Sequence, residues 1–233
     1  MIRVWQGWRR DPLADAADWK TFLDRLGSQF IPQTWKVMTR FGLQVYSPTV
    51  LQPMVDGLPE EVALLIYSSE AAYLEHKQDP EGIAYSASHA DIFGFPKGPQ
   101  RSRSGIAVDV GEVRAKYGTP VHRAAVSGTE ALESDKCVLE LAVLSKAHAK
   151  DAVGVLSALQ KIGGEMVFLI EDRYTLLWIA SDGGLDRAAV EVALTGLFDV
   201  APQIAWYQAE RASLKSTSGF KVIDGSSLYF KQD

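Results

Sequence analysis

Among the side chains of this 233-residue sequence that could do chemistry, one histidine is distinguished by its neighbours. His89 follows Tyr85 by four residues and precedes Phe93 by four, so on a helix the three rings share one face. A face of this kind packs against a sheet, and partial burial there favours the neutral imidazole. A neutral imidazole at physiological pH can act as a general base. The alternative is a core histidine that hydrogen-bonds to a backbone carbonyl.

The other three histidines carry weaker signals. His76 lies in a polar stretch between Glu75 and Lys77, and we expect it to be solvated. His122 lies in a candidate strand, and His148 lies at the start of a candidate helix. No two of the four histidines have the spacing of metal ligands and no HExxH motif occurs, so we expect no metal site.

The first residues of the chain supply the other candidates for a ligand site. Residues 2–9 alternate as a strand does, which places Arg3 and Trp5 on one face and Trp8 on the other. Only one tryptophan can therefore face a cavity, where it would either stack on a ligand or form part of the core. Arg3 would either anchor an anion or reach solvent from an edge strand. The candidate site is thus His89 as catalytic base, with substrate bound by Arg3, Trp5, Trp8, Tyr85 and Phe93.

The elements that would position these residues follow a clear order in the second half of the chain. Residues 136–213 alternate between apolar runs of strand length and segments with helical periodicity, in the order strand, helix, strand, strand, helix, strand. The expected strands are 138–144, 166–170, 174–180 and 204–208, and the expected helices are 149–162 and 186–198.

The first half is a looser copy of the same order. Proline and serine mark its boundaries, because proline interrupts ladders and helices and serine caps helix starts. The expected strands are 2–9, an edge strand at 43–51 and a central strand at 62–67. The first expected helix begins at Asp18 and ends or kinks at Pro32. The second begins at Ser68 or Ser69, breaks at Asp79-Pro80 and resumes over 81–93.

Both halves fit the β-α-β-β-α-β plan of ferredoxin-like units, in which an antiparallel sheet carries its helices on one face. We therefore expect an α+β fold of two tandem ferredoxin-like units. Residues 1–110 form the first, residues 111–135 a linker, and residues 136–233 the second, with a tail hairpin at Asp224-Gly225. The bare faces of two such sheets can bury each other, which would make one pseudo-dimeric α+β barrel.

The composition is that of an ordinary globular protein and argues against several classes. Hydrophobic residues make up 47% of the chain and charged residues 23%, while the net charge of −5 argues against a nucleic-acid partner. Cys137 is the only cysteine, so no disulfide forms within the chain. There is no secretory signal at the start and no window apolar enough to span a membrane. We expect a cytoplasmic protein of bacterial type.

The first 95 residues resemble the dimeric α+β barrel superfamily, which contains antibiotic-biosynthesis-type monooxygenases. The segments that carry the resemblance are Phe30-Ile31-Pro32, Val62 to Tyr67, Ser68-Ser69-Glu70 and Tyr85 to Phe93. The resemblance implies a small apolar substrate held between the sheet and its helices. The nearest oxygenases of that superfamily use an asparagine, a tryptophan and a histidine. Trp5 or Trp8 and His89 match two of these, and the chain contains no asparagine.

The same superfamily includes haem proteins with two such units in one chain, similar to chlorite dismutases. Their axial histidine lies on a helix of the second unit. The helix expected at 186–198 has no histidine, so we expect no haem and no other cofactor.

Two functions remain open at this point. The first is a small-molecule binder or cofactor-independent enzyme, of oxygenase or isomerase type, that takes a small apolar or aromatic molecule. The second is a non-enzymatic protein that binds a protein partner, in a regulatory or toxin-neutralising role. A hollow interior that holds a polar group favours the first, and a solid core with an exposed apolar patch favours the second. A homodimer is possible for either function.

Overall fold

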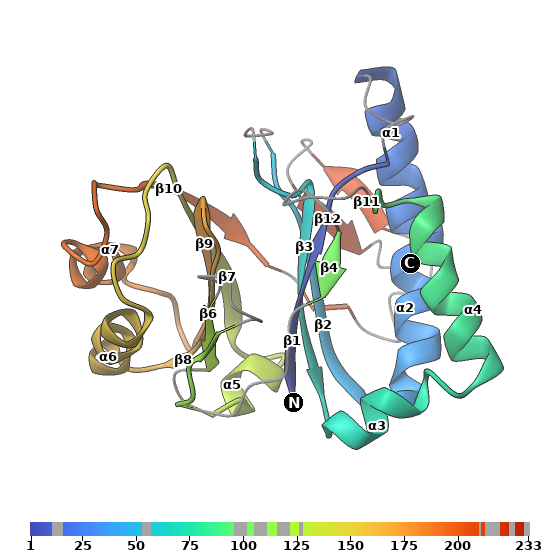
Figure 1. Ribbon diagram of the computed structural model, residues 1–233, viewed down its shortest axis with the longest axis horizontal. Helices are drawn as coiled ribbons and strands as arrows, with labels where there is room; N and C mark the ends of the chain where they lie inside the picture. The colour runs from blue at the N-terminus through green and yellow to red at the C-terminus, as the bar shows by residue number, and fades with distance from the viewer. Residues whose placement is uncertain are drawn as a thin grey trace. The chain divides into compact units, whose positions relative to one another are not determined.

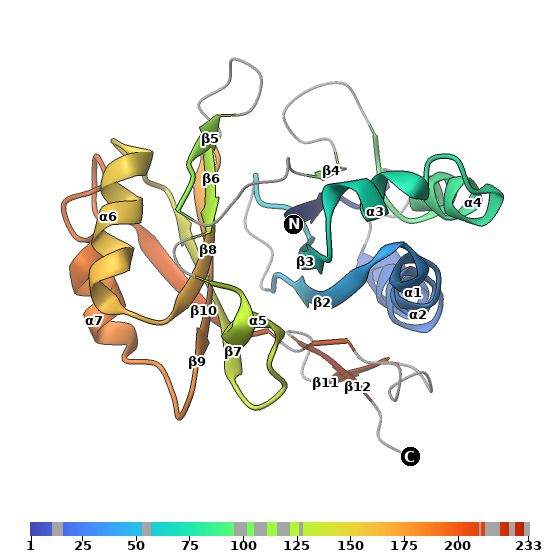
Figure 2. The same ribbon diagram turned by 90° about the horizontal axis from the view of Figure 1, so that it is seen from below.

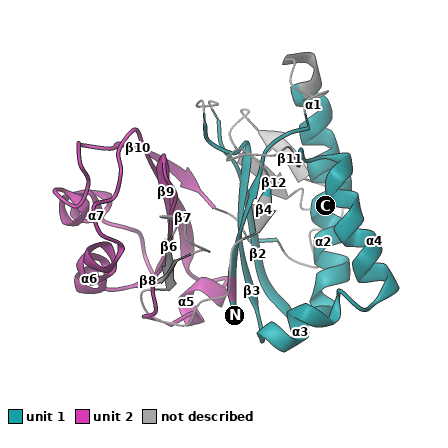
Figure 3. Cartoon of the chain, viewed as in Figure 1, with its two compact units in different colours: residues 1, 3–105, 210–233 teal, residues 2, 106–209 magenta. Residues whose placement is uncertain are grey.

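The computed structural model describes residues 1–10, 16–52, 57–95, 102–104, 111–115, 122–125, 128–209, 211–212, 220–223 and 227–230. The chain divides into two compact units (Figure 3). One holds Met1 with residues 3–105 and 210–233, and the other holds Ile2 with residues 106–209. Each unit contains an antiparallel sheet with helices against it, so the α+β class is confirmed (Figure 1).

The sheet of the first unit has the strand order β2-β3-β1-β4. Its strands are β1 at Ile2–Gly7, β2 at Leu43–Val50, β3 at Glu61–Tyr67 and β4 at Arg103–Ser104. β2 pairs antiparallel with β3, and β1 pairs antiparallel with β4. β2 lies at the edge, where Pro48 is tolerated because the ring nitrogen has no hydrogen to donate. β1 lies between β3 and β4, and its pairs with β4 are Trp5 with Ser104 and Gln6 with Arg103.

The main helices of this unit lie together on one face of its sheet, as Figures 1 and 2 show for α1, α2 and α4. The helical elements are α1 at Ala16–Arg25, α2 at Ile31–Met38, α3 at Glu70–Glu75 and α4 at Pro80–Ser88, with a π turn η2 at Leu26–Phe30 and 3-10 turns η3 at Thr39–Phe41 and η4 at His89–Asp91. The residues that they bury against the sheet include Phe22, Leu26, Phe30, Ile31 and Phe41.

Pro32 does not end the first helical segment. An α-helix would need a backbone N–H at this position, and proline has none. The π turn immediately before it changes the pairing, because the Ile31 amide donates to the Leu26 carbonyl, five residues back. The chain then continues as α2 with Pro32 in the first turn, where a missing N–H costs little.

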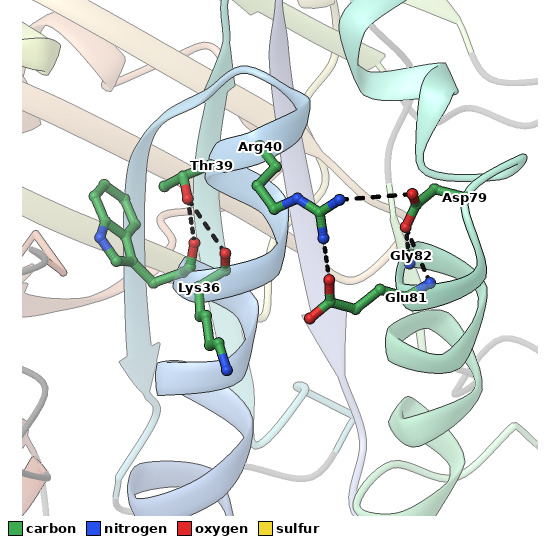
Figure 4. Close-up of polar contacts among 7 residues, drawn as sticks. Lys36, Thr39, Arg40, Asp79, Glu81 and Gly82 are labelled. Carbon is green, nitrogen blue, oxygen red and sulfur yellow. Dashed lines mark hydrogen bonds and ion pairs between the residues drawn. The ribbon is translucent and has the colours of Figure 1, made fainter.

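Side-chain caps determine where α3 and α4 begin. Ser69 accepts a hydrogen bond of 3.0 Å from the α3 backbone. Asp79 accepts hydrogen bonds of 2.9 and 3.1 Å from the Glu81 and Gly82 amides. Figure 4 shows that Arg40 of η3 forms ion pairs with both Asp79 and Glu81. These exposed pairs contribute little stability, but they link the end of the first helical segment to the start of α4.

The sheet of the second unit has the strand order β10-β7-β9-β8-β6-β5. Its strands are β5 at Arg114–Ala115, β6 at His122–Ala125, β7 at Val138–Ser145, β8 at Glu165–Ile170, β9 at Tyr174–Ser181 and β10 at Gln203–Gln208. α6 at Ala152–Ile162 and α7 at Arg187–Leu194 cover one face, and α5 is a single turn at Glu130–Glu133.

One large apolar residue of α6 does not join the core beneath α6 and α7, since the Val153 side chain is 58% exposed. Ala152, Val155, Leu156 and Leu159 face the sheet instead, because their spacing follows the 3.6-residue period from the Asp151 cap.

The segments expected as linker and tail carry regular structure. β5, β6 and α5 lie within residues 111–135, and β5 and β6 extend the second sheet. The tail forms an antiparallel hairpin of β11 at Phe220–Ile223 and β12 at Ser227–Phe230 and is grouped with the first unit. None of the described helices is both long and apolar enough to cross a membrane. A barrel formed from both sheets stays a prediction.

Candidate functional site

The first unit contains a cavity of about 230 Å³ between the inner face of its sheet and its helices. The cavity walls are mainly aromatic, with a few polar groups among them. The lining residues are Arg3, Trp5, Phe30, Thr34, Met38, Tyr46, Leu65, Tyr67, Tyr73, His76, Tyr85, Ser86, His89 and Phe95. Ser86 and Phe95 are exposed, so they mark the entrance.

His89 begins the turn η4, just after the last residue of α4. The helix expected at 81–93 therefore ends earlier than predicted, but His89 and Tyr85 keep the helical contact, with ring centroids 4.8 Å apart. The rings of Phe30 and Trp5 meet the imidazole edge to face at 4.7 and 5.1 Å. The imidazole is thus half-buried among three aromatic rings, at the wall of the cavity.

The hydrogen bond of His89 determines which ring nitrogen is free. Nδ1 lies 3.1 Å from the Tyr85 carbonyl oxygen, which can only accept, so Nδ1 carries the hydrogen. In the neutral imidazole, Nε2 then carries the lone pair. Burial lowers the pKa of His89 from 6.5 to about 4, although the bond to the Tyr85 carbonyl opposes that shift. The ring is therefore a neutral base throughout the physiological pH range.

Trp5 and Trp8 separate as the alternation of β1 predicts. Trp5 lines the cavity, and Trp8 is buried outside its lining. Phe93 also does not line the cavity, contrary to the prediction. Its ring lies 5.1 Å from the Trp5 ring and supports it from the side. A Cβ atom at Gly7 would lie only 2.7 Å from Phe93 Cδ1, so this contact depends on glycine.

Thr34 connects two of the cavity tyrosines. Its hydroxyl donates to the Phe30 carbonyl at 2.8 Å and lies 3.0 Å from the Tyr85 hydroxyl. Because the single Thr34 hydrogen is already used, Tyr85 is the donor in the second bond. Burial raises the pKa of both Tyr85 and Tyr46, so both phenols are neutral donors at physiological pH.

Arg3 and His76 form a second polar corner of the cavity around Tyr73. The Arg3 guanidinium lies 4.1 Å from the Tyr73 ring centroid, and the His76 ring lies 4.6 Å from it. His76 is only 5% exposed, so the expectation of a solvated side chain is wrong. Its Nδ1 hydrogen-bonds to the Tyr73 carbonyl within α3, and burial lowers its pKa. The polar neighbours Glu75 and Lys77 suggested exposure, but the end of α3 directs the His76 side chain inward.

Glu61 is the most unusual group near the cavity. Its side chain is completely buried, and neither carboxyl oxygen has a hydrogen-bond partner among the described residues. The nearby indole nitrogen of Trp5 is buried and likewise without a partner of good geometry there. Burial raises the pKa of Glu61 to about 8, and the Trp5 indole only partly opposes this. Glu61 is therefore mainly a neutral acid at pH 7.

The sequence signal for Glu61 lies in the parity of its strand. Glu61 is in phase with Leu65 and Tyr67 along β3, and those two residues line the cavity. We expected the strand to begin at Val62, which left Glu61 outside it. Sequence reasoning also missed several other residues of the cavity wall, namely Thr34, Tyr46, Tyr67, Tyr73 and His76.

The residues that line the cavity do not include the two remaining histidines. His148 is exposed in the second unit, and the side chain of His122 lies outside the described ones. Within the described part of the chain, no cluster of three or more histidine, cysteine, aspartate or glutamate side chains could hold a metal ion.

Comparison with known proteins gives no family assignment. No protein-family model matches the chain, and no curated protein matches it significantly. Two solved structures align over most of their length, each described as a proposed monooxygenase. The one from Lactobacillus acidophilus is 8% identical, with a TM-score of 0.40 over 94% of this chain and 96% of that one. The one from Fusobacterium nucleatum is 11% identical, with a TM-score of 0.46 over 99% and 97%. Scores this low carry no argument about function.

Proposed function

We propose that the cavity of the first unit binds a small, largely apolar molecule of one or two rings, and that His89 acts on it as a general base. The observation that carries the proposal is the neutral imidazole at the cavity wall, with Nδ1–H held by a backbone carbonyl and Nε2 left as the base. The volume of about 230 Å³ is below that of sites for drug-sized ligands, which limits the number of rings.

The low pKa of His89 restricts which protons it can take. A base whose conjugate acid has a pKa of about 4 removes only protons that are already acidic, such as those beside a carbonyl. The reaction class is therefore cofactor-independent proton transfer, as in an isomerase. With dioxygen as co-reactant, the same carbanion would lead to oxygenation. Arg3, Trp5 and Tyr85 would bind the ligand in either case.

The architecture proposed for this function is a pair of ferredoxin-like units of the dimeric α+β barrel class. The strand order β2-β3-β1-β4 supports it in the first unit, and the order β10-β7-β9-β8 supports it in the second. A hollow first unit with polar groups in its wall favours a small-molecule ligand over a purely protein-binding role.

Deuterium exchange tests the proposal directly. The probe is 2-indanone, a bicyclic ketone with acidic C–H groups beside its carbonyl, incubated with the protein in D₂O and followed by NMR. We expect exchange above the buffer rate in the wild type, and a loss of about 100-fold or more in His89→Gln, which can still donate to the Tyr85 carbonyl. His148→Gln, in the second unit, is the matched control and should exchange at the wild-type rate.

Two results would overturn the proposal. If His89→Gln exchanges as fast as the wild type, His89 is not the base. If 2-indanone neither binds, by calorimetry, nor exchanges, the cavity does not serve this ligand class. Oxygen consumption measured in parallel separates the isomerase from the oxygenase reaction.

A further inference from the structure

Glu61 has no role in the proton transfer described so far, yet its environment is costly for the fold. A buried polar group without a hydrogen bond destabilises a protein, because it has lost its contacts with water and gained none in return. Three such atoms belong to two neighbouring side chains here: both carboxyl oxygens of Glu61 and the indole nitrogen of Trp5. Groups of this kind that persist at a cavity are candidates for a ligand site, since a ligand can satisfy them.

The position of Glu61 directs it toward the cavity. Along β3 it lies on the same face as Leu65 and Tyr67, which line the cavity. Burial raises the pKa of Tyr46 and of Tyr85, and an ionised Glu61 would raise both further, so Glu61 lies near two cavity tyrosines. Glu61 itself is not part of the cavity wall. Contact with a ligand requires the buried Glu61 side chain to turn toward the cavity, and no hydrogen bond among the described residues holds its carboxyl in place.

The adjacent residue Glu60 lies in a different environment from that of Glu61. Glu60 accepts a 2.9 Å hydrogen bond from the Arg9 amide, and its carboxylate lies 3.7 Å from the Arg9 guanidinium. Two adjacent glutamates therefore differ completely: one is paired with a cation, and the other is buried among aromatic rings. Glu60 is accordingly a matched control for experiments on Glu61.

The donors available determine the kind of ligand group. A neutral carboxyl has one O–H to donate, and the Trp5 indole has one N–H. Two donors on neighbouring side chains fit an oxygen acceptor such as a carbonyl. They do not fit an ammonium group, which would bring further hydrogens towards the indole N–H.

We propose that Glu61, together with the Trp5 indole N–H, hydrogen-bonds the carbonyl oxygen of the ligand, so that the substrate class is an aromatic or alicyclic ketone. This inference rests on the proposed function of the cavity. When His89 Nε2 takes a proton from the carbon beside the carbonyl, the electron pair of that C–H bond moves onto the oxygen as an enolate. Two preplaced donors stabilise this developing charge, and the proton returns from His89 to a carbon of the product.

Matched ligands test the proposal. The probes are 2-indanone, indane, which lacks the oxygen, and 2-aminoindane, which carries an ammonium group instead. In the wild type and in Glu60→Gln we expect 2-indanone to bind about 10- to 100-fold more tightly than indane. In Glu61→Leu the two affinities should become equal through the loss of 2-indanone binding, while Glu61→Gln, which keeps a donor, should stay within a few-fold of the wild type.

A stability measurement keeps the test independent of ligand binding. Glu61→Leu should raise the melting temperature, because it removes unpaired buried oxygens and adds apolar contacts. A lower melting temperature would mean that the carboxyl has a structural partner, which would overturn the proposal.

The binding results separate the two proposals. If 2-indanone binds equally well to wild type and Glu61→Leu, the role of Glu61 fails and the function of the cavity stands. If 2-aminoindane binds more tightly than 2-indanone, the site takes a cation and the ketone class is wrong. If neither 2-indanone nor indane binds the wild type, both proposals fail.

Discussion

The layers between sheet and helices in the two units differ in chemistry although their four main strands follow the same order. In the second unit the layer is aliphatic, with Leu156, Leu177, Ile179 and Val190 at its centre and Phe168 as a buried ring. In the first unit the corresponding layer holds four tyrosines, two histidines and a tryptophan around a cavity, with a glutamate beside it. The second unit is thus stabilised by dense apolar packing. The first unit is packed less densely and has polar groups in its cavity wall that a ligand can bind.

The buried glutamates of the two units show the same contrast. Glu140 of β7 accepts a 3.2 Å hydrogen bond from Arg187 Nε, and Arg187 in turn lies over the Trp206 ring at 5.2 Å. Glu61 of β3 has no such partner among the described residues. The pairing of Glu140 fits a role in the fold, whereas the unpaired carboxyl of Glu61 fits the proposed role in ligand binding.

The largest change in stability is expected when a buried carboxyl, like that of Glu61 in the first unit, is introduced into the core of the second unit. Leu177→Glu places an unpaired carboxyl in an aliphatic core and should cost about 4 kcal/mol or more. Urea denaturation followed by circular dichroism measures the loss. Leu177→Met is the control, with an expected cost under about 1.5 kcal/mol. A cost of Leu177→Glu near that of the control would contradict the contrast between the two layers.

The pH dependence of stability should separate Glu61 from His89. The folded pKa of Glu61, about 8, lies above its unfolded value, so its contribution weakens folding as pH rises from 4.5 to 8, by up to about 1.4 kcal/mol per pH unit. The folded pKa of His89, about 4, lies below its unfolded value, so its contribution strengthens folding as pH rises from 4 to 6.5.

In the wild type these contributions oppose each other between pH 4.5 and 6.5, and stability falls above pH 6.5. Glu61→Gln should remove the fall above pH 6.5, and His89→Gln should leave stability falling from pH 4.5 upward. Urea midpoints across this range give the profiles. Unchanged profiles in both variants would show that neither group titrates differently in the folded protein.

Blocking the entrance should affect binding without affecting the fold. Ser86 is exposed on α4 at the cavity entrance, so Ser86→Trp should lower the affinity for 2-indanone at least tenfold, or about 1.4 kcal/mol. The change in stability should stay within about 0.5 kcal/mol, as for most exposed positions. Val192→Trp on α7, where the residue is 73% exposed, is the matched substitution in the second unit and should leave binding unchanged.

The smallest effect is expected from the paired glutamate. Arg187→Ala should destabilise the second unit by about 1 kcal/mol, because it leaves the mostly buried Glu140 without its partner. Binding of 2-indanone should not change. Calorimetric titration alongside thermal unfolding checks both statements, and a loss of binding here would mean that the two units are coupled.

The sequence predicted the elements better than the wall of the site. Period-2 and 3.6-residue patterns located most strands and helices, because burial of one face imposes them directly. His89, Tyr85 and Trp5 were found because each lies on a strongly patterned element. Residues of the cavity wall that belong to other elements become neighbours only through tertiary packing, which one sequence does not encode locally.

His76 and Glu61 were missed for a more specific reason. Both are polar residues in polar surroundings, and composition there predicts solvent exposure. His76 is turned inward by the short helix α3, and Glu61 by the parity of a strand that begins one residue earlier than expected. For polar residues at the ends of helices and strands, the exposure expected from composition therefore differs most from the exposure in the structure.

The π turn before Pro32 has a consequence for how this chain can change. A π turn contains one residue more than the α-helical turn it replaces. Deleting a single residue within Leu26–Phe30 would therefore leave an ordinary α-helical turn, and Pro32 would then lie in the interior of one continuous helix. Proline breaks or kinks a helix there, because it lacks the N–H and its ring clashes with the preceding turn. The extra residue is thus what allows α1 and α2 to follow each other directly with a proline between them.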